Sequence, residues 1–285
     1  MNRLENTIAS ICGSEPVSIQ PMSEGSFTAN YYGKLEDGRE VFIKSSLSDD
    51  SVLLNEKNGL FELGKANVIG VPQVYGLSEN TLITEWIRRS QASSSNLVYR
   101  SFGKKLAELH KFSSQQFGFP ENNVIGATPQ INLPQNSNWA DFVVSNRFDI
   151  QFEILQKNGY ADHELMDKYF RLRESIPTII EGSEEKPALI HGDLWSGNFI
   201  ISDDQEVVLI DPACSYSHRE MEFGMTTLFG GFPQKFYEGY QDEYPLLPGS
   251  ERRIKLYSLY HIVNHFNLFG DSYRGSTQAV LDSLL

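Results

Sequence analysis

The sequence predicts an α+β protein with two lobes, a small β-rich N-terminal lobe and a mostly helical C-terminal lobe. Three observations support this prediction. Residues 15–47 carry strand and turn signals, the pattern after Ser90 is helical, and the serine-rich stretch SQASSSN between these regions is typical of a boundary. We therefore expect lobes over residues 1–90 and 91–285, with a cleft between them.

The N-terminal lobe is predicted to follow the order β-β-α-β-β after a short amphipathic helix at the N-terminus. Within residues 15–47, the Asp37-Gly38 pair predicts a hairpin turn, because glycine adopts positive φ without a steric penalty. Residues 51–66, SVLLNEKNGLFELGKA, place several apolar side chains at helical spacing. VPQVYGLSENTLITEWI then predicts two strands joined by a turn.

The C-terminal lobe is predicted to be helical around one polar segment and one hairpin. SNLVYRSFGKKLAELHKFS has an apolar stripe that predicts a helix, whereas residues 113–137 are rich in Pro, Gly, Asn and Gln and predict an ordered loop. Further helices are expected over residues 138–157, over 162–181 and in KLYSLYHIVNHFNLFG near the end of the chain. Two short strands are expected on either side of residues 202–204.

Composition limits the class of protein. The 285 residues carry a formal net charge of −13, which argues against binding to nucleic acid or to an anionic membrane, because both need clustered cations. The two cysteines, Cys12 and Cys214, form no metal or disulfide pattern, and no stretch approaches the roughly 20 apolar residues of a membrane helix. The N-terminus does not read as a signal peptide. We therefore expect a cytoplasmic protein, and a monomer, since no coiled coil or long exposed apolar stripe is evident.

The segment HGDLWSGN, from His191 to Asn198, carries the strongest chemical signal. It matches the spacing of the kinase catalytic loop H-R-D-L-x-x-x-N, in which the Asp accepts the substrate hydroxyl proton and the Asn holds magnesium. Asp193 and Asn198 occupy these two positions, although Gly192 replaces the Arg. The alternative is that His191, Asp193 and Asn198 only cap a tight turn.

A second candidate carboxylate follows an apolar strand over residues 207–210. An Asp at the end of a buried strand is costly unless it is hydrogen-bonded or binds a cation. The magnesium-binding Asp of the kinase D-F-G motif holds such a position, and the triplet here is Asp211-Pro212-Ala213. Asn198 and Asp211 are therefore the candidate ligands of Mg²⁺, and ATP is the expected phosphoryl donor.

A kinase also needs a lysine for the ATP phosphates, and VFIK at the end of a strand supplies Lys44. Glu56, on the helix that follows, is expected to pair with this lysine. The segment SEGSFT is the candidate nucleotide-covering loop, in which the backbone at Gly25 and Ser26 would face phosphate. The backbone that could pair with adenine is expected where the lobes join, at Glu85, Trp86 and Ile87.

These motifs and their surroundings resemble the fructosamine kinase (ketosamine-3-kinase) family. The resemblance rests on HGDLWSGN, LIDPA, SHREMEFGMTTLFGGF and NNVIGATPQIN, and it extends from about Val17 to the last helix. HGDLWSGN together with HRE and LFGGF separates this family from aminoglycoside and choline kinases, which share the fold. The resemblance implies a protein-kinase-like fold and ATP-dependent phosphorylation of the 3-hydroxyl of a 1-amino-1-deoxyketose, which is a ketosamine.

The same resemblance implies roles for the residues of the phosphoryl-transfer machinery. Asp193 would be the catalytic base, and Asn198 and Asp211 would hold magnesium. His191 would brace the loop around Asp211. Lys44 and Glu56 would form the phosphate clamp.

On the acceptor side, the resemblance implies that Trp195 packs near the sugar. His218, Arg219 and Glu220 would line or support the acceptor pocket, although His218 and Arg219 could equally anchor the loop that follows the magnesium ligand. Two further acceptor-side candidates are Gln130 and Asn132.

The sequence departs from the family pattern in the nucleotide loop and after HRE. The usual paired glycine is Glu24-Gly25 here, Thr28 stands where Asn is frequent, and Glu222 stands where Asp is more usual. Ser26 occupies the position of a cysteine found in some members, so we expect no redox switch there.

Two other functions fit parts of the pattern. One is a kinase for another small hydroxyl compound, such as an aminoglycoside or choline, which an acceptor screen would separate. The other is a pseudokinase, which would have lost a catalytic group, yet Lys44, Asp193, Asn198 and Asp211 are all present. The sequence leaves open which sugar is preferred and whether the amine is a small molecule or a protein lysine.

Overall fold

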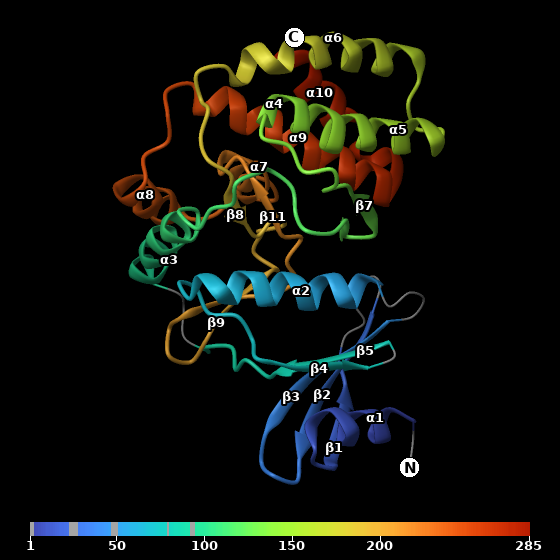
Figure 1. The fold of residues 1–285 in the computed structure, drawn as a ribbon, viewed down its shortest axis with the longest axis vertical. Helices are drawn as coiled ribbons and strands as arrows, with labels where there is room; N and C mark the ends of the chain where they lie inside the picture. The colour runs from blue at the N-terminus through green and yellow to red at the C-terminus, as the bar shows by residue number, and fades with distance from the viewer. Residues whose placement is uncertain (1–2, 23–27, 47–50, 79, 92–94) are drawn as a thin grey trace. The chain divides into compact units, whose positions relative to one another are not determined.

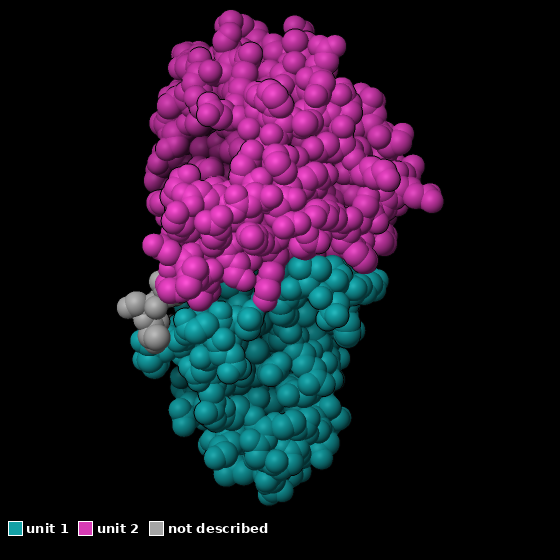
Figure 2. All heavy atoms as spheres, turned by 90° about the vertical axis from the view of Figure 1, so that its left-hand side faces the viewer, with its two compact units in different colours: residues 1–94, 198–212 teal, residues 95–197, 213–285 magenta. Residues whose placement is uncertain are grey.

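The computed structural model describes residues 3–22, 28–46, 51–78, 80–91 and 95–285. The chain forms two compact units, coloured separately in Figure 2. Unit 1 comprises residues 1–94 and 198–212, and unit 2 comprises residues 95–197 and 213–285. The predicted nucleotide loop around Gly25 and Ser26 lies outside the described residues.

Unit 1 is built on a five-stranded antiparallel sheet in the order β1-β2-β3-β5-β4 (Figure 1). The predicted turn at Asp37-Gly38 joins β2 to β3, and Gly38 has φ of 90°. α2 coincides with the predicted helix and contacts β3, β4 and β5. The elements of unit 1 before its second segment are α1 (Arg3–Cys12), β1 (Pro16–Pro21), β2 (Thr28–Leu35), β3 (Glu40–Ser46), α2 (Ser51–Ala66), β4 (Val74–Ser78) and β5 (Thr81–Glu85).

The chain returns to unit 1 through a short hairpin, β9 (Phe199–Ile201) and β10 (Val207–Leu209). This hairpin bonds to the earlier segment, since the N–H of Leu209 donates to the Gly70 carbonyl and the N–H of Ser90 donates to the Ile201 carbonyl. The predicted single boundary after residue 90 did not include this return. The two strands were predicted from the apolar residues on either side of the turn at residues 202–204, but their pairing with residues more than 100 positions away carries no local signal.

Unit 2 is mostly helical, as predicted. α9 is its central helix: it contacts α5, α6, α7 and α10, and most of its residues are buried. Its helices are α3 (Asn96–Leu109), α4 (Trp139–Val143), a π-helix η1 (Val144–Phe148), α5 (Asp149–Lys157), α6 (His163–Ile180), α7 (Glu220–Thr226), α8 (Gln234–Glu243), α9 (Ser250–Phe269), a 3₁₀-helix η2 (Gly270–Tyr273) and α10 (Arg274–Leu284).

Two features of unit 2 correct the predictions. The segment 113–137, expected as a loop, contains a hairpin of β6 (Asn123–Ile125) and β7 (Thr128–Gln130). The strands β8 (Ala188–Ile190) and β11 (Ser215–Ser217) pair across the motif region and were not predicted. The strands of both pairs are three residues long, which is shorter than the roughly four to eight residues that sequence patterns can identify as a strand. In the described residues, no helix is both long enough and apolar enough to span a membrane.

Candidate active site

The candidate residues fall into two sets, one in each unit. In unit 1 the predicted pairing of Lys44 with Glu56 is present. Nζ of Lys44, on β3, lies 2.8 and 2.9 Å from the two carboxylate oxygens of Glu56, on α2. The same ammonium group also contacts the carboxylate of Asp211. One cation therefore serves two carboxylates that come from different elements.

Burial and charge act in opposite directions on this cluster. Burial lowers the pKa of Lys44, but the Asp211 and Glu56 carboxylates outweigh it and hold the pKa above its ordinary value, so the lysine stays charged. Burial, opposed by the Lys44 charge and supported by the nearby Asp211, raises the pKa of Glu56. A charged lysine held beside a cavity is suited to binding a phosphate group.

Asp211 follows β10, and its backbone has φ of 55°, a left-handed conformation that Asp tolerates better than most residues. The N–H of Ile210 donates to the carbonyl of Asn198 at 3.0 Å, so the β9–β10 hairpin brings residues 198 and 211 to the same end. Proteins hold Mg²⁺ with one or two carboxylates together with substrate phosphates. The Asp211 carboxylate, whose side chain is 39% exposed, fits this ion, and Asn198 at the same end of the hairpin could add an amide oxygen.

Next to this cluster is a cavity of about 230 Å³ within unit 1. Trp86 forms part of its wall and packs edge-on against Tyr32, with ring centroids 5.0 Å apart. The N–H of Glu85 donates to the Gln73 carbonyl and the N–H of Trp86 to the Glu40 carbonyl. Adenine pairing at the predicted segment would therefore use its carbonyl groups or Ile87. The predicted residues that line the cavity are Lys44, Glu56, Glu85, Trp86, Ile87 and Asp211.

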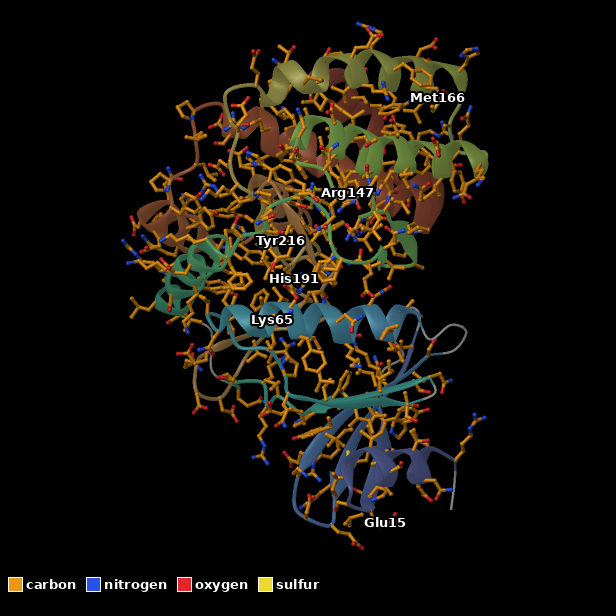
Figure 3. The ribbon with its side chains drawn as sticks, viewed as in Figure 1. Glu15, Lys65, Arg147, Met166, His191 and Tyr216 are labelled. Carbon is orange, nitrogen blue, oxygen red and sulfur yellow. The ribbon has the colours of Figure 1, made fainter. Side chains whose placement is uncertain are left out.

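The second set is the HGDLWSGN loop of unit 2, which follows β8. His191, labelled in Figure 3, is fully buried, and its Nδ1 lies 3.3 Å from the backbone nitrogen of Asp193. The His191 carbonyl accepts from the N–H of Ala213 at 2.9 Å. Gly192 has φ of 84°, and a Cβ there would lie 2.1 Å from the Ala213 carbonyl oxygen. Glycine is therefore required where protein kinases carry Arg.

Glu222 binds the backbone of this loop, a role that the sequence did not reveal. Its two carboxylate oxygens accept from the N–H groups of His191, at 2.6 Å, and Gly192, at 3.0 Å. Burial alone would raise the pKa of Glu222, but His110 and the His191 backbone hold it below the ordinary value. The sequence marked Glu222 as a departure from Asp. Its distance of 31 positions from His191 gave no signal of this contact.

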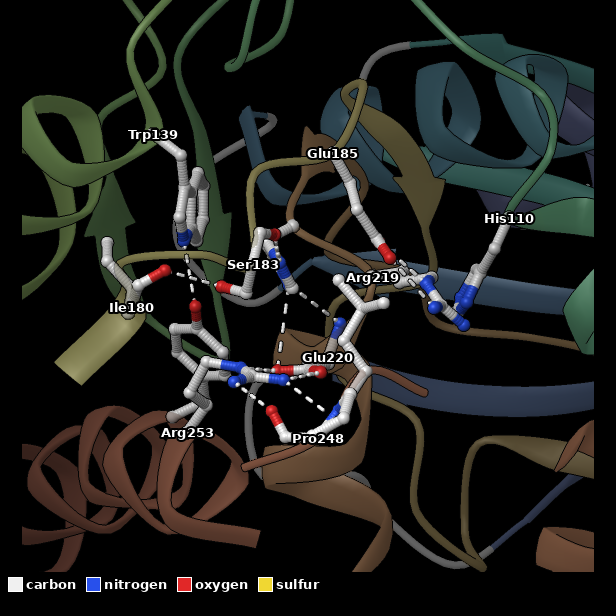
Figure 4. Close-up of polar contacts among 12 residues, drawn as sticks. His110, Trp139, Ile180, Ser183, Glu185, Arg219, Glu220, Pro248 and Arg253 are labelled. Atoms are coloured by element: carbon white, nitrogen blue, oxygen red, sulfur yellow. Dashed lines mark hydrogen bonds and ion pairs between the residues drawn. The ribbon is translucent and has the colours of Figure 1, made fainter. Parts of the chain in front are cut away.

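The predicted acceptor residues His218, Arg219 and Glu220 are buried in a polar network (Figure 4). Arg219 forms two bonds with Glu185, at 2.7 and 2.8 Å, and Glu220 forms two with Arg253, at 2.6 and 2.7 Å. These contacts favour the anchoring alternative for Arg219. Direct contact with an acceptor stays a prediction for all three residues.

His218 is buried but borders a cavity, whereas Trp195 is exposed. His218 Nε2 lies 2.8 Å from the Ser183 carbonyl oxygen, and the residue lines a cavity of about 530 Å³ with Trp139 and Glu184. Trp195 is 38% exposed, and its indole covers Gly197, where a Cβ would lie 2.3 Å from the ring. An exposed indole can stack on a sugar ring, but packing of Trp195 near the sugar stays a prediction.

The fold, the Lys44–Glu56 pair and the loop containing Asp193 define a phosphotransferase of the protein-kinase-like class. The fructosamine kinase model matches residues 3–285, and the chain belongs to that family.

Individual proteins show the same similarity. The chloroplastic protein-ribulosamine 3-kinase of Oryza sativa subsp. indica is 38% identical over 257 residues, which cover 87% of this chain and 73% of that protein. A solved structure assigned as a fructosamine-3-kinase from Thermobifida fusca YX-ER1 is 28% identical, with a TM-score of 0.90 over 100% of this chain and 99% of that one. The gentamicin complex of APH(2")-IIa, 15% identical with a TM-score of 0.67 over 100% of this chain and 95% of that one, shares the fold.

Proposed function

We propose that this protein transfers the γ-phosphoryl group of ATP to the 3-hydroxyl of ketosamines, the adducts formed when sugars glycate amines. The observation that carries the proposal is the family match over residues 3–285 in a chain that keeps the Lys44–Glu56 pair. The protein-ribulosamine 3-kinase of rice supports a ketosamine acceptor.

In this proposal each chemical group of the site has a separate task. Asp193 orients the 3-hydroxyl and accepts its proton, while the buried carboxylate of Glu222 holds the loop that carries Asp193. Lys44 binds the ATP phosphates, and Glu56 keeps the lysine in place. Asp211 and Asn198 would hold Mg²⁺, and the bound ion would neutralise the charge of the ATP phosphates.

The chemistry of the product explains why phosphorylation would serve to remove a sugar from an amine. Hydroxide is a poor leaving group at C3 of a ketosamine, whereas phosphate is a good one. Once the phosphate is on O3, its elimination followed by hydrolysis releases the amine. The enzyme therefore needs only to position the hydroxyl and stabilise charge.

We further propose a monomeric, cytoplasmic enzyme. The reducing cytosol suits a chain whose two cysteines are far apart in sequence, and the net charge of −13 suits an acceptor that carries a protonated amine. An aminoglycoside acceptor is the second candidate for the site. It is less well supported, because the APH(2")-IIa structure is only 15% identical in sequence and shares the fold alone.

An acceptor screen tests the proposal. Magnesium-dependent ADP release is measured with ribulose-lysine, fructose-lysine and an aminoglycoside as separate acceptors. We expect turnover with a ketosamine and its loss in Asp193→Asn. The matched control is Asp204→Asn, which changes an exposed Asp in the turn between β9 and β10 and should leave turnover unchanged. Turnover with the aminoglycoside alone would refute the ketosamine proposal.

A further inference from the structure

Two amide side chains of the β6–β7 hairpin bind the backbone that follows the candidate magnesium ligand. Nε2 of Gln130 donates to the carbonyl of Ala213 at 3.0 Å, and Nδ2 of Asn123 donates to the carbonyl of Cys214 at 2.8 Å. Both amides are buried, with 2% and 6% of their surface exposed. The hairpin therefore supplies one donor to each of two successive peptide groups.

The orientation of the two amides is fixed by their other contacts. The second proton of Gln130 Nε2 goes to Asn123 Oδ1, at 2.9 Å, and Gln130 Oε1 accepts from the hydroxyl of Tyr260, at 3.1 Å. Asn132 adds a second donor to Asn123 Oδ1, at 2.7 Å. If the Gln130 amide were reversed, its oxygen would face two other oxygens, which is unfavourable.

The network continues to a buried cation on the π-helix. Nη2 of Arg147 donates to Asn132 Oδ1 at 2.7 Å, and Nη1 donates to the Ile131 carbonyl (Arg147 is labelled in Figure 3). Burial lowers the pKa of Arg147 to about 10, so this guanidinium remains charged at neutral pH. Its donors fix the strand end from which Gln130 reaches the Ala213 carbonyl.

Ala213 is the link between this network and the catalytic loop. Its N–H donates to the His191 carbonyl at 2.9 Å, and its own carbonyl accepts from Gln130. The oxygen of that carbonyl also lies nearest to the position that a Cβ on Gly192, the residue before Asp193, would take. A shift of the Ala213 peptide would therefore change its bond to the His191 carbonyl and its close approach to Gly192, and both contacts fix the conformation of the loop.

We propose that Gln130 and Asn123 are positioning residues for phosphoryl transfer: they fix the Ala213–Cys214 backbone and, through it, the loop that carries Asp193. Buried amides need all their hydrogen bonds, so an apolar side chain would be the simpler choice if only packing were required. Small displacements of a catalytic group can cost large factors in rate. The proposal rests on the proposed kinase activity and adds a contribution from outside the kinase motifs.

The test compares two buried glutamines of unit 2. Gln130→Met keeps the volume but removes both donors to Asn123 and Ala213. The matched control is Gln151→Met: Gln151 is 1% exposed and bonds to Asn264 and Asn267 on α9 and, at 3.5 Å, to Thr128 of β7. Its hydrogen bonds in the described part of the chain do not include the carbonyls of Ala213 and Cys214. We expect kcat to fall about tenfold in Gln130→Met with the KM for ATP within about twofold of wild type. In Gln151→Met we expect a similar fall in Tm with kcat within about twofold.

A second variant keeps the test decisive if Gln130→Met does not fold. Asn123→Asp keeps the acceptor for Gln130 and Asn132 but loses the donor to Cys214, and we expect kcat to fall about threefold. The inference is overturned if kcat stays at the wild-type value in folded Gln130→Met or in Asn123→Asp, or if both glutamine variants lose kcat equally. The kcat of each variant is compared with that of the wild type on whichever acceptor the wild type phosphorylates. Absence of turnover with ketosamines would therefore count against the proposed function alone.

Discussion

Two groups of ion pairs in this protein are built around buried cations but have different roles. In unit 1, Lys44 is shared by Glu56 and Asp211 at the wall of a cavity, and the Asp211 side chain is 39% exposed. In unit 2, Arg219 with Glu185 and Arg253 with Glu220 are paired through two bonds each. Both guanidinium groups also donate to backbone carbonyls, and that of Arg219 donates to the Tyr240 hydroxyl.

The difference shows how a functional ion pair can be distinguished from a structural one. In unit 2 the cations have their charge compensated and their donors bound within the protein, so a substrate would find little left to bind. In unit 1 one cation is shared between two carboxylates beside open space, an arrangement that can be rearranged by a phosphate and a metal ion. The predictions below test this distinction from the largest expected effect to the smallest.

The largest effect on stability is expected at Glu220. Glu220→Ala leaves the Arg253 guanidinium buried without its carboxylate, and breaking such a pair typically costs about 3–5 kcal/mol in the free energy of unfolding. Urea denaturation followed by circular dichroism measures the change. A loss below about 1 kcal/mol would show that this pair is not the anchor that its geometry suggests.

Lys44 should behave in the opposite way. Lys44→Met removes the phosphate-binding cation, so kcat/KM for ATP should fall about a hundredfold or more, because preorganised charge at the phosphates is lost. The free energy of unfolding should change by less than in Glu220→Ala, since the partly exposed Asp211 can be solvated and Glu56, whose pKa burial already raises, can take up a proton. Steady-state kinetics and urea denaturation of the same preparations provide the comparison. A stable variant with wild-type kinetics would remove Lys44 from the site.

Buried histidines of unit 2 should make stability depend on pH. Burial lowers the pKa of His261 to about 3, whereas the unfolded chain takes up this proton near pH 6.5. Stability from this residue is therefore complete above about pH 6.5 and is lost as the pH falls toward 3. Between pH 7 and 5.5, His261→Gln should lose about 1 kcal/mol less than wild type in urea denaturation. The control for the substitution itself is His163→Gln, which makes the same change at a side chain that is 98% exposed.

The smallest effect is expected at an exposed pair. Arg100 and Asp242 lie 2.5 Å apart, but their side chains are 44% and 43% exposed, so Asp242→Asn should cost between about 0.2 and 1 kcal/mol. The same denaturation measurement gives the value. A loss of unfolding free energy equal to that of Glu220→Ala would contradict the claim that a buried ion pair contributes more to stability than an exposed one.

Local patterns in the sequence were sufficient for the residues whose partners are set by secondary structure. The turn at Asp37-Gly38 and the helix over 51–66 follow from local spacing, and the pairing of Lys44 with Glu56 follows from the kinase motif. They were not sufficient for the β6–β7 hairpin, because its Asn and Gln residues resemble a loop until their distant partners are known. Glu222 is a similar case, since its role depends on hydrogen bonds to two backbone N–H groups about 30 positions away.

The central claim is that the phosphate goes to O3 of a ketosamine, and product analysis by ³¹P and ¹H NMR tests it most directly. The protein is incubated with ribulose-lysine, ATP and Mg²⁺, and the spectra are followed over time. We predict a phosphorus signal coupled to the proton on C3, followed by release of lysine. A phosphate coupled to another carbon, or transfer that is absent with ribulose-lysine and fructose-lysine alike, would contradict the account.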